Sequence, residues 1–138
     1  MKANELMIGD WVNVTAAENI VRPDILSILP KKGKVVGIDG DCIYVDFVEY
    51  LFMFGDIEPI PLTPEILEKN GFKKCDECEQ WTLYKHSCYN ILWSADEPYL
   101  EIVSYNGDSG EFNRMGISFV HELQHALRLC GIEKEVVL

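Results

Sequence analysis

One short motif in this chain could carry out chemistry, the segment His121-Glu122-Leu123-Gln124-His125. Two histidines four residues apart share one face of a helix, and neutral imidazoles at that spacing bind zinc. The glutamate between them is the residue type that activates a metal-bound water in zinc peptidases. The motif therefore offers an enzymatic hypothesis, a zinc-dependent hydrolase with His121 and His125 as ligands and Glu122 as general base.

A catalytic zinc needs a third protein ligand, and the sequence does not supply one at a customary place. The position six residues after His125 is Gly131, and too few residues follow for another helix. Glu133 and Glu135 lie just beyond the helix end, and His86 or an upstream cysteine would give an unusual ligand order. The motif thus matches the zinc signature only in part.

A helix over residues 118–130 would carry this motif, with Gly131 as its stop signal. A helical wheel places Phe119, Leu123 and Cys130 on the apolar face, with Val120 and Leu127 at its margin, and turns both histidines away from the core. We therefore expect a solvated helix face with His121 and His125 partly exposed, and we keep the zinc hydrolase as the alternative.

A second group of metal-ligand residue types follows in the middle of the chain: Cys75, Cys78, His86 and Cys88. A Cys-x-x-Cys turn presents two thiolates to zinc, and residues two apart on a strand share a face, so the geometry is allowed. His-x-Cys is nevertheless an uncommon second pair, and the acidic neighbours do not favour a redox role. We expect ordinary turn and strand cysteines, with a structural zinc as the alternative.

The charge of the chain narrows the classes of partner. The formal net charge is −11, from 23 acidic and 12 basic residues in 138, so direct contact with nucleic-acid phosphates or an anionic membrane is disfavoured. The basic runs 31–34 and 73–74 are interpreted as solvated turns. Five cysteines and no secretory segment predict reduced thiols and a cytoplasmic protein.

The first half of the chain reads as short strands. Residues 8–14 are interpreted as a turn followed by an alternating strand, and two more strands are expected at 34–38 and 42–48, with a tight hairpin turn at Asp39-Gly40 between them. A long connection over 16–32 is expected to contain one helical turn. This pattern suggests a small SH3-like barrel. The apolar run 50–54 is interpreted as a core strand or a seam between two halves, with a dimer or partner patch as the alternative.

The prolines at 59 and 61 mark a border, after which the chain changes character. Thr63 and Pro64 predict the start of a helix that ends at Asn70-Gly71. Strands are expected at 81–84, 89–93 and 99–105, followed by a loop at 106–110, the late helix and a closing strand at 135–138.

Three segments carry a resemblance to a known family: the opening residues 1–12, the central residues 57–72 and the late-helix residues 119–127. They resemble a family of small uncharacterised proteins of gut Bacteroidetes, often encoded in phage-like or mobile regions. The resemblance implies an opening β module, a central helix, strands and a late helix, and it implies no activity. In that family the late helix often reads Val-His-x-Leu-Gln, with other residues at the positions of Glu122 and His125.

Together these observations predict an α+β protein in which an SH3-like β-barrel module, residues 1–62, packs on a helix–antiparallel strands–helix module, residues 63–138. We expect a non-enzymatic interaction or accessory protein of phage or mobile-element origin, without a cofactor. Its expected partner is a protein of unknown identity, and a homo-oligomer stays open.

Overall fold

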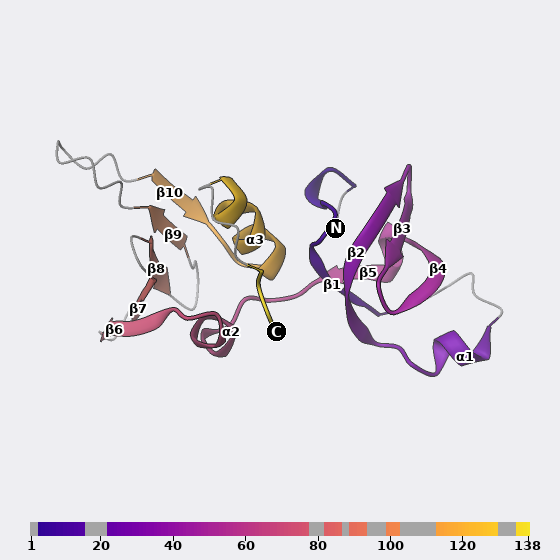
Figure 1. Cartoon of the computed structure of the whole chain (residues 1–138), viewed down its shortest axis with the longest axis horizontal. Helices are drawn as coiled ribbons and strands as arrows, with labels where there is room; N and C mark the ends of the chain where they lie inside the picture. Colours follow the sequence, from indigo (N-terminus) through magenta and orange to yellow (C-terminus); the bar gives the residue numbers. More distant parts are fainter. Residues whose placement is uncertain are drawn as a thin grey trace. The chain divides into compact units, whose positions relative to one another are not determined.

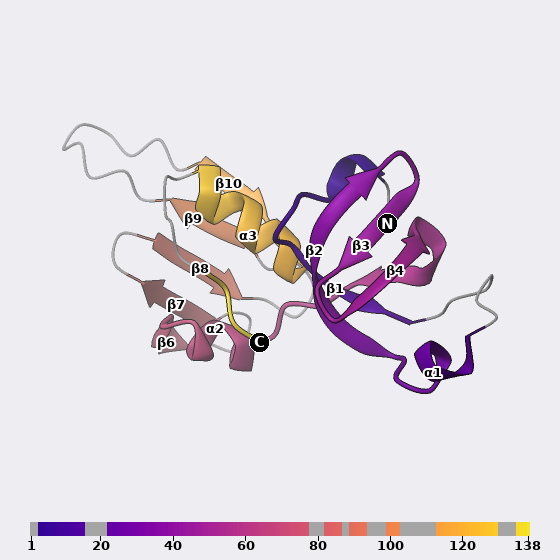
Figure 2. The same ribbon diagram turned by 45° about the vertical axis from the view of Figure 1, so that its right-hand side comes forward.

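The computed structural model describes residues 3–15, 22–77, 82–86, 89–93, 99–102, 113–129 and 135–138. The chain divides into two units, Met1–Ile60 and Pro61–Leu138, and each contains a five-stranded sheet (Figures 1 and 2). All strand pairs are antiparallel, and short helices accompany both sheets. The mixed α+β class predicted from the sequence is confirmed.

The N-terminal sheet is a meander with one return strand. Its strands are β1 (Trp11–Val14), β2 (Lys31–Asp39), β3 (Cys42–Val45), β4 (Val48–Met53) and β5 (Ile57–Pro59), in the order β4-β3-β2-β1-β5. Three short helices accompany them: η1 (Ala3–Glu5), α1 (Pro23–Leu26) and η2 (Phe54–Asp56). Among the described residues β4 and β5 do not pair with each other, so the sheet is open and β4 is one of its edges.

The core of this unit lies on one face of the sheet because alternate residues of each strand point inward. Val12 and Val14 of β1 are fully buried, whereas Trp11 and Asn13 between them are partly exposed. Buried residues from the other strands complete the core: Leu6, Ile25, Val35, Ile43, Val45, Phe52 and Ile57. The hairpin predicted at Asp39-Gly40 is confirmed, since Gly40 has a φ of 58° and Asp39 pairs with Cys42 across the turn.

The basic runs predicted as solvated turns lie in strands instead. In β2, the Lys31 ammonium stands 4.9 Å from the Phe47 ring centre and the Lys34 ammonium 5.1 Å from that of Trp11. Cation–π contact lets these lysines occupy a paired strand. Lys74 of the second unit likewise pairs across a strand with Tyr84 and forms an exposed ion pair with Glu77.

The C-terminal sheet is a simple meander in the order β10-β9-β8-β7-β6. Its strands are β6 (Lys73–Glu77), β7 (Thr82–His86), β8 (Tyr89–Trp93), β9 (Tyr99–Ile102) and β10 (Asn113–Gly116), and its helices are α2 (Pro64–Lys69) and α3 (Val120–Leu129). The helix α3 lies beside β9 and β10 in both views (Figures 1 and 2). The strands expected at 81–84, 89–93 and 99–105 correspond to β7, β8 and β9 over the described residues, whereas β6 and β10 were not predicted. Residues 81 and 103–105 of these predictions, and the loop expected at 106–110, lie outside the described residues.

The start of the second unit follows the sequence signals closely. The Thr63 hydroxyl accepts a hydrogen bond from the Ile66 N–H at 3.3 Å, and Pro64 occupies the first turn of α2. Gly71 ends the helix with a φ of 86°. The predicted helix is therefore confirmed at both ends.

The closing strand predicted at 135–138 is wrong, and the Asn70 side chain explains how this segment is held. The Asn70 Nδ2 donates to the backbone oxygens of Ile66 and Val137, both at 2.7 Å, while its Oδ1 accepts from the Val137 N–H at 2.9 Å. A side-chain amide thus pairs with the Val137 backbone as a neighbouring strand would. Val136 beside it is buried, with 1% of its surface exposed.

Candidate functional site

The two histidines of the motif lie close together on the first two turns of α3. Their ring centres are 5.7 Å apart, with the rings near perpendicular at 78°. The spacing predicted from the sequence therefore does bring His121 and His125 together on one helix. Whether the pair forms a chemical site depends on Glu122 and on a third ligand.

The Glu122 carboxylate is directed back along the chain toward the start of the helix. Its Oε2 accepts hydrogen bonds from the backbone N–H groups of Ser118, at 2.6 Å, and Phe119, at 3.1 Å. The first N–H groups of a helix have no intrahelical partner, and a glutamate at the third helical position satisfies them. The position that would hold the general base is therefore occupied by a helix-capping residue.

The burial of α3 corrects the predicted wheel. His121, predicted on the solvated face, is buried, with 5% of its surface exposed, and so is Gln124, with 7%; His125 is half-buried. The His121 ring stacks on Phe119 at 5.9 Å, with 14° between the planes. The buried face of α3 is therefore centred on Val120 and Leu127, which the helical wheel placed at the margin of the apolar face. The wheel treats histidine as polar, whereas the imidazole ring of His121 packs through its flat apolar surface.

The described residues contain no group of three histidine, cysteine, aspartate or glutamate side chains placed to hold a metal ion. Glu133, one candidate for a third ligand, lies outside these residues, whereas Glu135 is described and exposed. His121 and His125 therefore stand as a pair within the part of α3 and its surroundings that the structure describes.

The cysteine and histidine group in the middle of the chain falls largely outside the described residues. Cys78 and Cys88 are not among them, and of His86 only the backbone in β7 is described. Cys75 lies in β6 at an irregularity in the pairing with β7, and its exposed thiol is free. The predicted turn at Cys75 is therefore a strand. The zinc alternative for these four residues stays a prediction.

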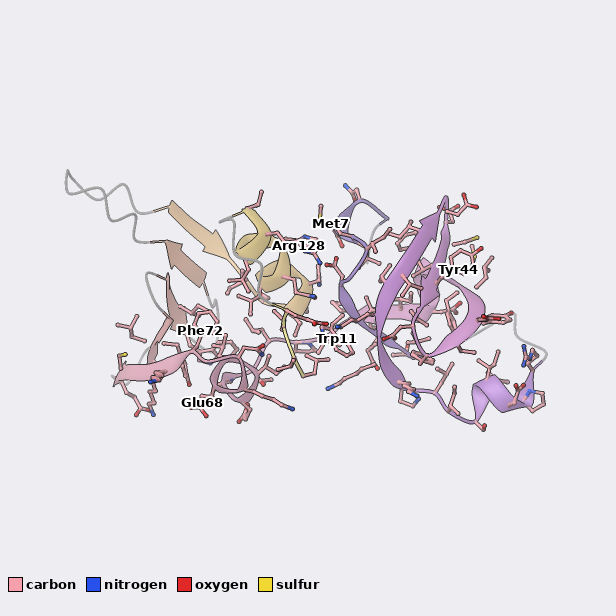
Figure 3. All side chains as sticks on the ribbon, viewed as in Figure 1. Met7, Trp11, Tyr44, Glu68, Phe72 and Arg128 are labelled. Atoms are coloured by element: carbon pink, nitrogen blue, oxygen red, sulfur yellow. The ribbon has the colours of Figure 1, made fainter. Side chains whose placement is uncertain are left out.

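A different feature emerges on the N-terminal sheet, on the side away from the core. We call it the outer face, defined by Val36 of β2, Tyr44 of β3, and Leu51 and Met53 of β4. Their exposed fractions are 53%, 36%, 39% and 38%. Tyr44, labelled in Figure 3, pairs with Leu51 across the strands, so these two side chains are neighbours on the outer face. An antiparallel sheet with one buried face normally presents polar residues on the other.

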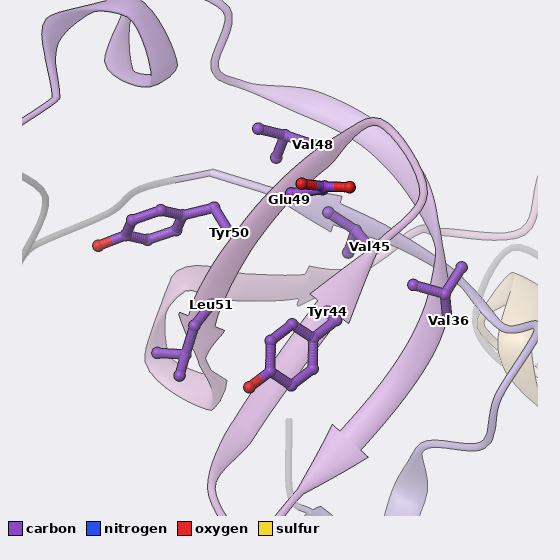
Figure 4. Close-up of a pocket in the computed structure, with 7 residues that line it drawn as sticks. All are labelled: Val36, Tyr44, Val45, Val48, Glu49, Tyr50 and Leu51. Atoms are coloured by element: carbon purple, nitrogen blue, oxygen red, sulfur yellow. The ribbon is translucent and has the colours of Figure 1, made fainter.

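A groove of about 650 Å³ opens at this face (Figure 4). Its lining consists of Val36, Tyr44, Val45, Val48, Glu49, Tyr50 and Leu51. Val45 pairs with Val48 and Tyr44 with Leu51, so Glu49 and Tyr50 have no partner residue on β3 and form a bulge. A bulge bends the strand and redirects its side chains. Here it places one carboxylate in an otherwise largely apolar groove at the sheet edge.

Sequence reasoning recognised only part of this surface. The run 50–54 was interpreted as core or seam, yet Phe52 is fully buried while Leu51 and Met53 on either side are exposed. The available signal was the unbroken apolar run. Successive residues of a strand point to opposite faces, so such a run puts apolar side chains on the solvent face as well as on the core face. Val36 and Tyr44 gave no such signal, because their neighbourhood depends on how three strands pair.

Comparison of the whole chain with protein-family models, curated proteins and solved structures finds no match. None of the helices among the described residues has the length and apolar character needed to cross a membrane. These comparisons therefore contribute nothing to the functional proposal.

Proposed function

We propose that this chain is a non-enzymatic interaction protein that binds a partner protein through the outer face of its N-terminal unit. The observation that carries the proposal is the exposure of four large apolar side chains on one sheet face: Val36, Tyr44, Leu51 and Met53. Contiguous apolar surface of this kind marks binding sites, whereas single exposed apolar residues need no explanation. The groove beside these residues supplies the concave shape that an anchoring side chain fills.

We further propose that the N-terminal unit is an SH3-like module. The strand order β4-β3-β2-β1-β5 and the short helix η2 between β4 and β5 support this interpretation. The long β1–β2 connection and the bulges in β2 and β4 agree with a strongly bent small sheet. The resemblance to proteins of phage-like and mobile regions is the basis for proposing an accessory role there.

The alternative, a zinc hydrolase, receives less support from the geometry. The Glu122 carboxylate already binds two backbone N–H groups, and His121 is buried against Phe119. Metal analysis of protein purified without chelator separates the two functions. Stoichiometric zinc that disappears in a His121→Gln, His125→Gln variant would favour the hydrolase.

A photo-reactive amino acid at position 51 tests the binding proposal. Placed in the full chain in its native host, it should form a covalent adduct with one partner protein. The matched control is position 28, since Ile28 has a similar exposed fraction, 42% against 39%, and lies in the same unit but outside the outer face. Equal adducts from both positions, or none from position 51, would contradict the proposal.

A further inference from the structure

The free edge of β4 runs alongside the groove. The described residues include no strand that pairs with this edge, since β4 ends the sheet order and pairs only with β3. An edge strand presents unpaired backbone N–H and C=O groups, which hydrogen-bond readily to another extended chain. Four groove residues, Val48, Glu49, Tyr50 and Leu51, belong to this same strand. The unpaired backbone groups of the β4 edge and the groove that its side chains line are therefore next to each other.

Side chains on the exposed side of β4 follow a simple order. Glu49, Leu51 and Met53 alternate along the strand and are all exposed, while Phe52 is buried. An added strand would set alternate residues beside Leu51 and Met53 and would reach Glu49 where the strand bends at the bulge. It would meet first a carboxylate and then two apolar side chains, or the reverse in the opposite direction.

Charge determines which occupant fits this order. No described cation forms an ion pair with Glu49, and the groove lining contains no lysine or arginine. The whole chain carries a net charge of −11. A second copy of the chain would bring another Glu49 and another −11 to the same edge, and like charges across an interface oppose association. A lysine or arginine on the incoming strand would instead be attracted by Glu49 and by the negative net charge of the chain.

Resting on the proposed function, we infer that the occupant is an extended segment of a basic partner protein that adds as a strand to the edge of β4. Its recognition pattern is a lysine or arginine beside Glu49 and two apolar residues at alternate positions beside Leu51 and Met53. The backbone hydrogen bonds supply affinity, and the alternate side chains supply specificity. Tyr44 and Tyr50 flank the groove with aromatic surface on which the aliphatic stem of the cation can lie (Figure 4).

A displayed library of random decapeptides, selected on the intact chain, tests this inference. Selected peptides should be enriched in the pattern basic-x-apolar-x-apolar or its reverse, and depleted in acidic residues and proline. A synthetic selected peptide should bind Glu49→Lys about fivefold to tenfold more weakly than the natural chain, since one favourable charge contact becomes a repulsive one. Selection repeated on Glu49→Lys should favour acidic peptides, a change that a structural role for Glu49 would not produce.

Glu58→Lys is the matched control, because Glu58 is an exposed glutamate on β5 at the opposite edge of the same sheet. Peptide binding should change less than about twofold in this variant. Methylation of alternate peptide amides adds a test of strand addition. One alternate set, facing β4, should abolish binding when methylated, and the other set should tolerate it.

The remaining outcomes separate this inference from the proposed function. Peptides that need Leu51 but are acidic or proline-rich would overturn the basic-strand inference and leave the binding function intact. Self-association of the chain that Leu51→Thr removes would show a second copy as occupant and would also overturn it. If the library yields no peptide whose binding depends on Leu51, the basic-strand inference is overturned. If, in addition, no adduct forms from position 51, the proposed binding function is overturned as well.

Discussion

The Glu122 carboxylate accepts a 2.6 Å hydrogen bond from the backbone N–H of Ser118, four residues earlier in the chain. This contact, together with the Phe119 N–H at 3.1 Å, makes Glu122 a helix cap. The glutamate of a motif that matches the zinc-peptidase signature therefore caps the N-terminus of α3. The residue type is the same in both roles, because each uses a carboxylate oxygen as an acceptor, here of backbone N–H groups.

The capping role predicts a specific stability pattern. Glu122→Ala should lower the free energy of unfolding by about 0.5–2 kcal/mol, the usual cost of losing a cap. Glu122→Gln should lose less, because the amide oxygen still accepts a hydrogen bond. Urea unfolding of the three proteins measures the difference. Unchanged stability in Glu122→Ala, combined with loss of bound zinc, would restore the catalytic interpretation.

Asn70 should be essential for holding residues 135–138. Asn70→Ala removes three hydrogen bonds of a buried side chain, two of them to the partly buried backbone of Val137, at a cost of about 1–3 kcal/mol. Asn70→Asp should cost at least as much, since the new oxygen faces the Val137 carbonyl oxygen. Hydrogen exchange at the Val137 amide reports the local effect. Slow exchange retained in Asn70→Ala, which removes the oxygen that accepts from the Val137 N–H, would rule out this pairing.

Gly33 should tolerate no side chain, because the Phe47 ring occupies the space. A Cβ at position 33 would lie 2.6 Å from the Phe47 ring. Gly33→Ala should therefore lower the free energy of unfolding by about 1–3 kcal/mol through overpacking. Gly55→Ala is the matched control, since nothing lies within 4 Å of a Cβ there. Equal thermal stability of the two variants would contradict the packing described for β2.

Tyr84 predicts a loss of stability at alkaline pH. Burial raises the pKa of the Tyr84 phenol above its ordinary value of 10.0, and the nearby Glu68 carboxylate adds to this shift. The unfolded chain therefore releases this proton first, so the contribution is complete below about pH 10 and is lost as pH rises toward the folded-state pKa. Tyr84→Phe should show a smaller fall in unfolding free energy between about pH 8 and pH 11. Parallel curves for the two proteins would exclude the effect.

Local sequence signals predicted the elements whose residues interact with near neighbours. The helix α2 and the Asp39-Gly40 turn were placed correctly because caps and turns are short-range devices. The strands β6 and β10 were missed because Lys73, Lys74 and the polar start of β10 have little strand propensity of their own. They are extended because they pair with β7 and β9, their neighbours in the chain.

The candidate site was harder to predict for the same reason. The motif at residues 121–125 is contiguous in sequence, so it attracted the functional interpretation. The outer face brings together residues from β2, β3 and β4, and only strand pairing makes Tyr44 and Leu51 neighbours. The register in which β2, β3 and β4 pair determines which residues share this surface, and the spacing of those residues along the chain does not predict that register.

The most direct test of the central claim is the yield of the position-51 photo-adduct in two backgrounds, Glu49→Lys and Glu122→Gln. Both substitutions alter a single glutamate carboxylate, one in the groove and one in the motif on α3. We predict a large fall in adduct yield with Glu49→Lys and an unchanged yield with Glu122→Gln. An unchanged yield with Glu49→Lys and a loss with Glu122→Gln would contradict the assignment of partner binding to the outer face.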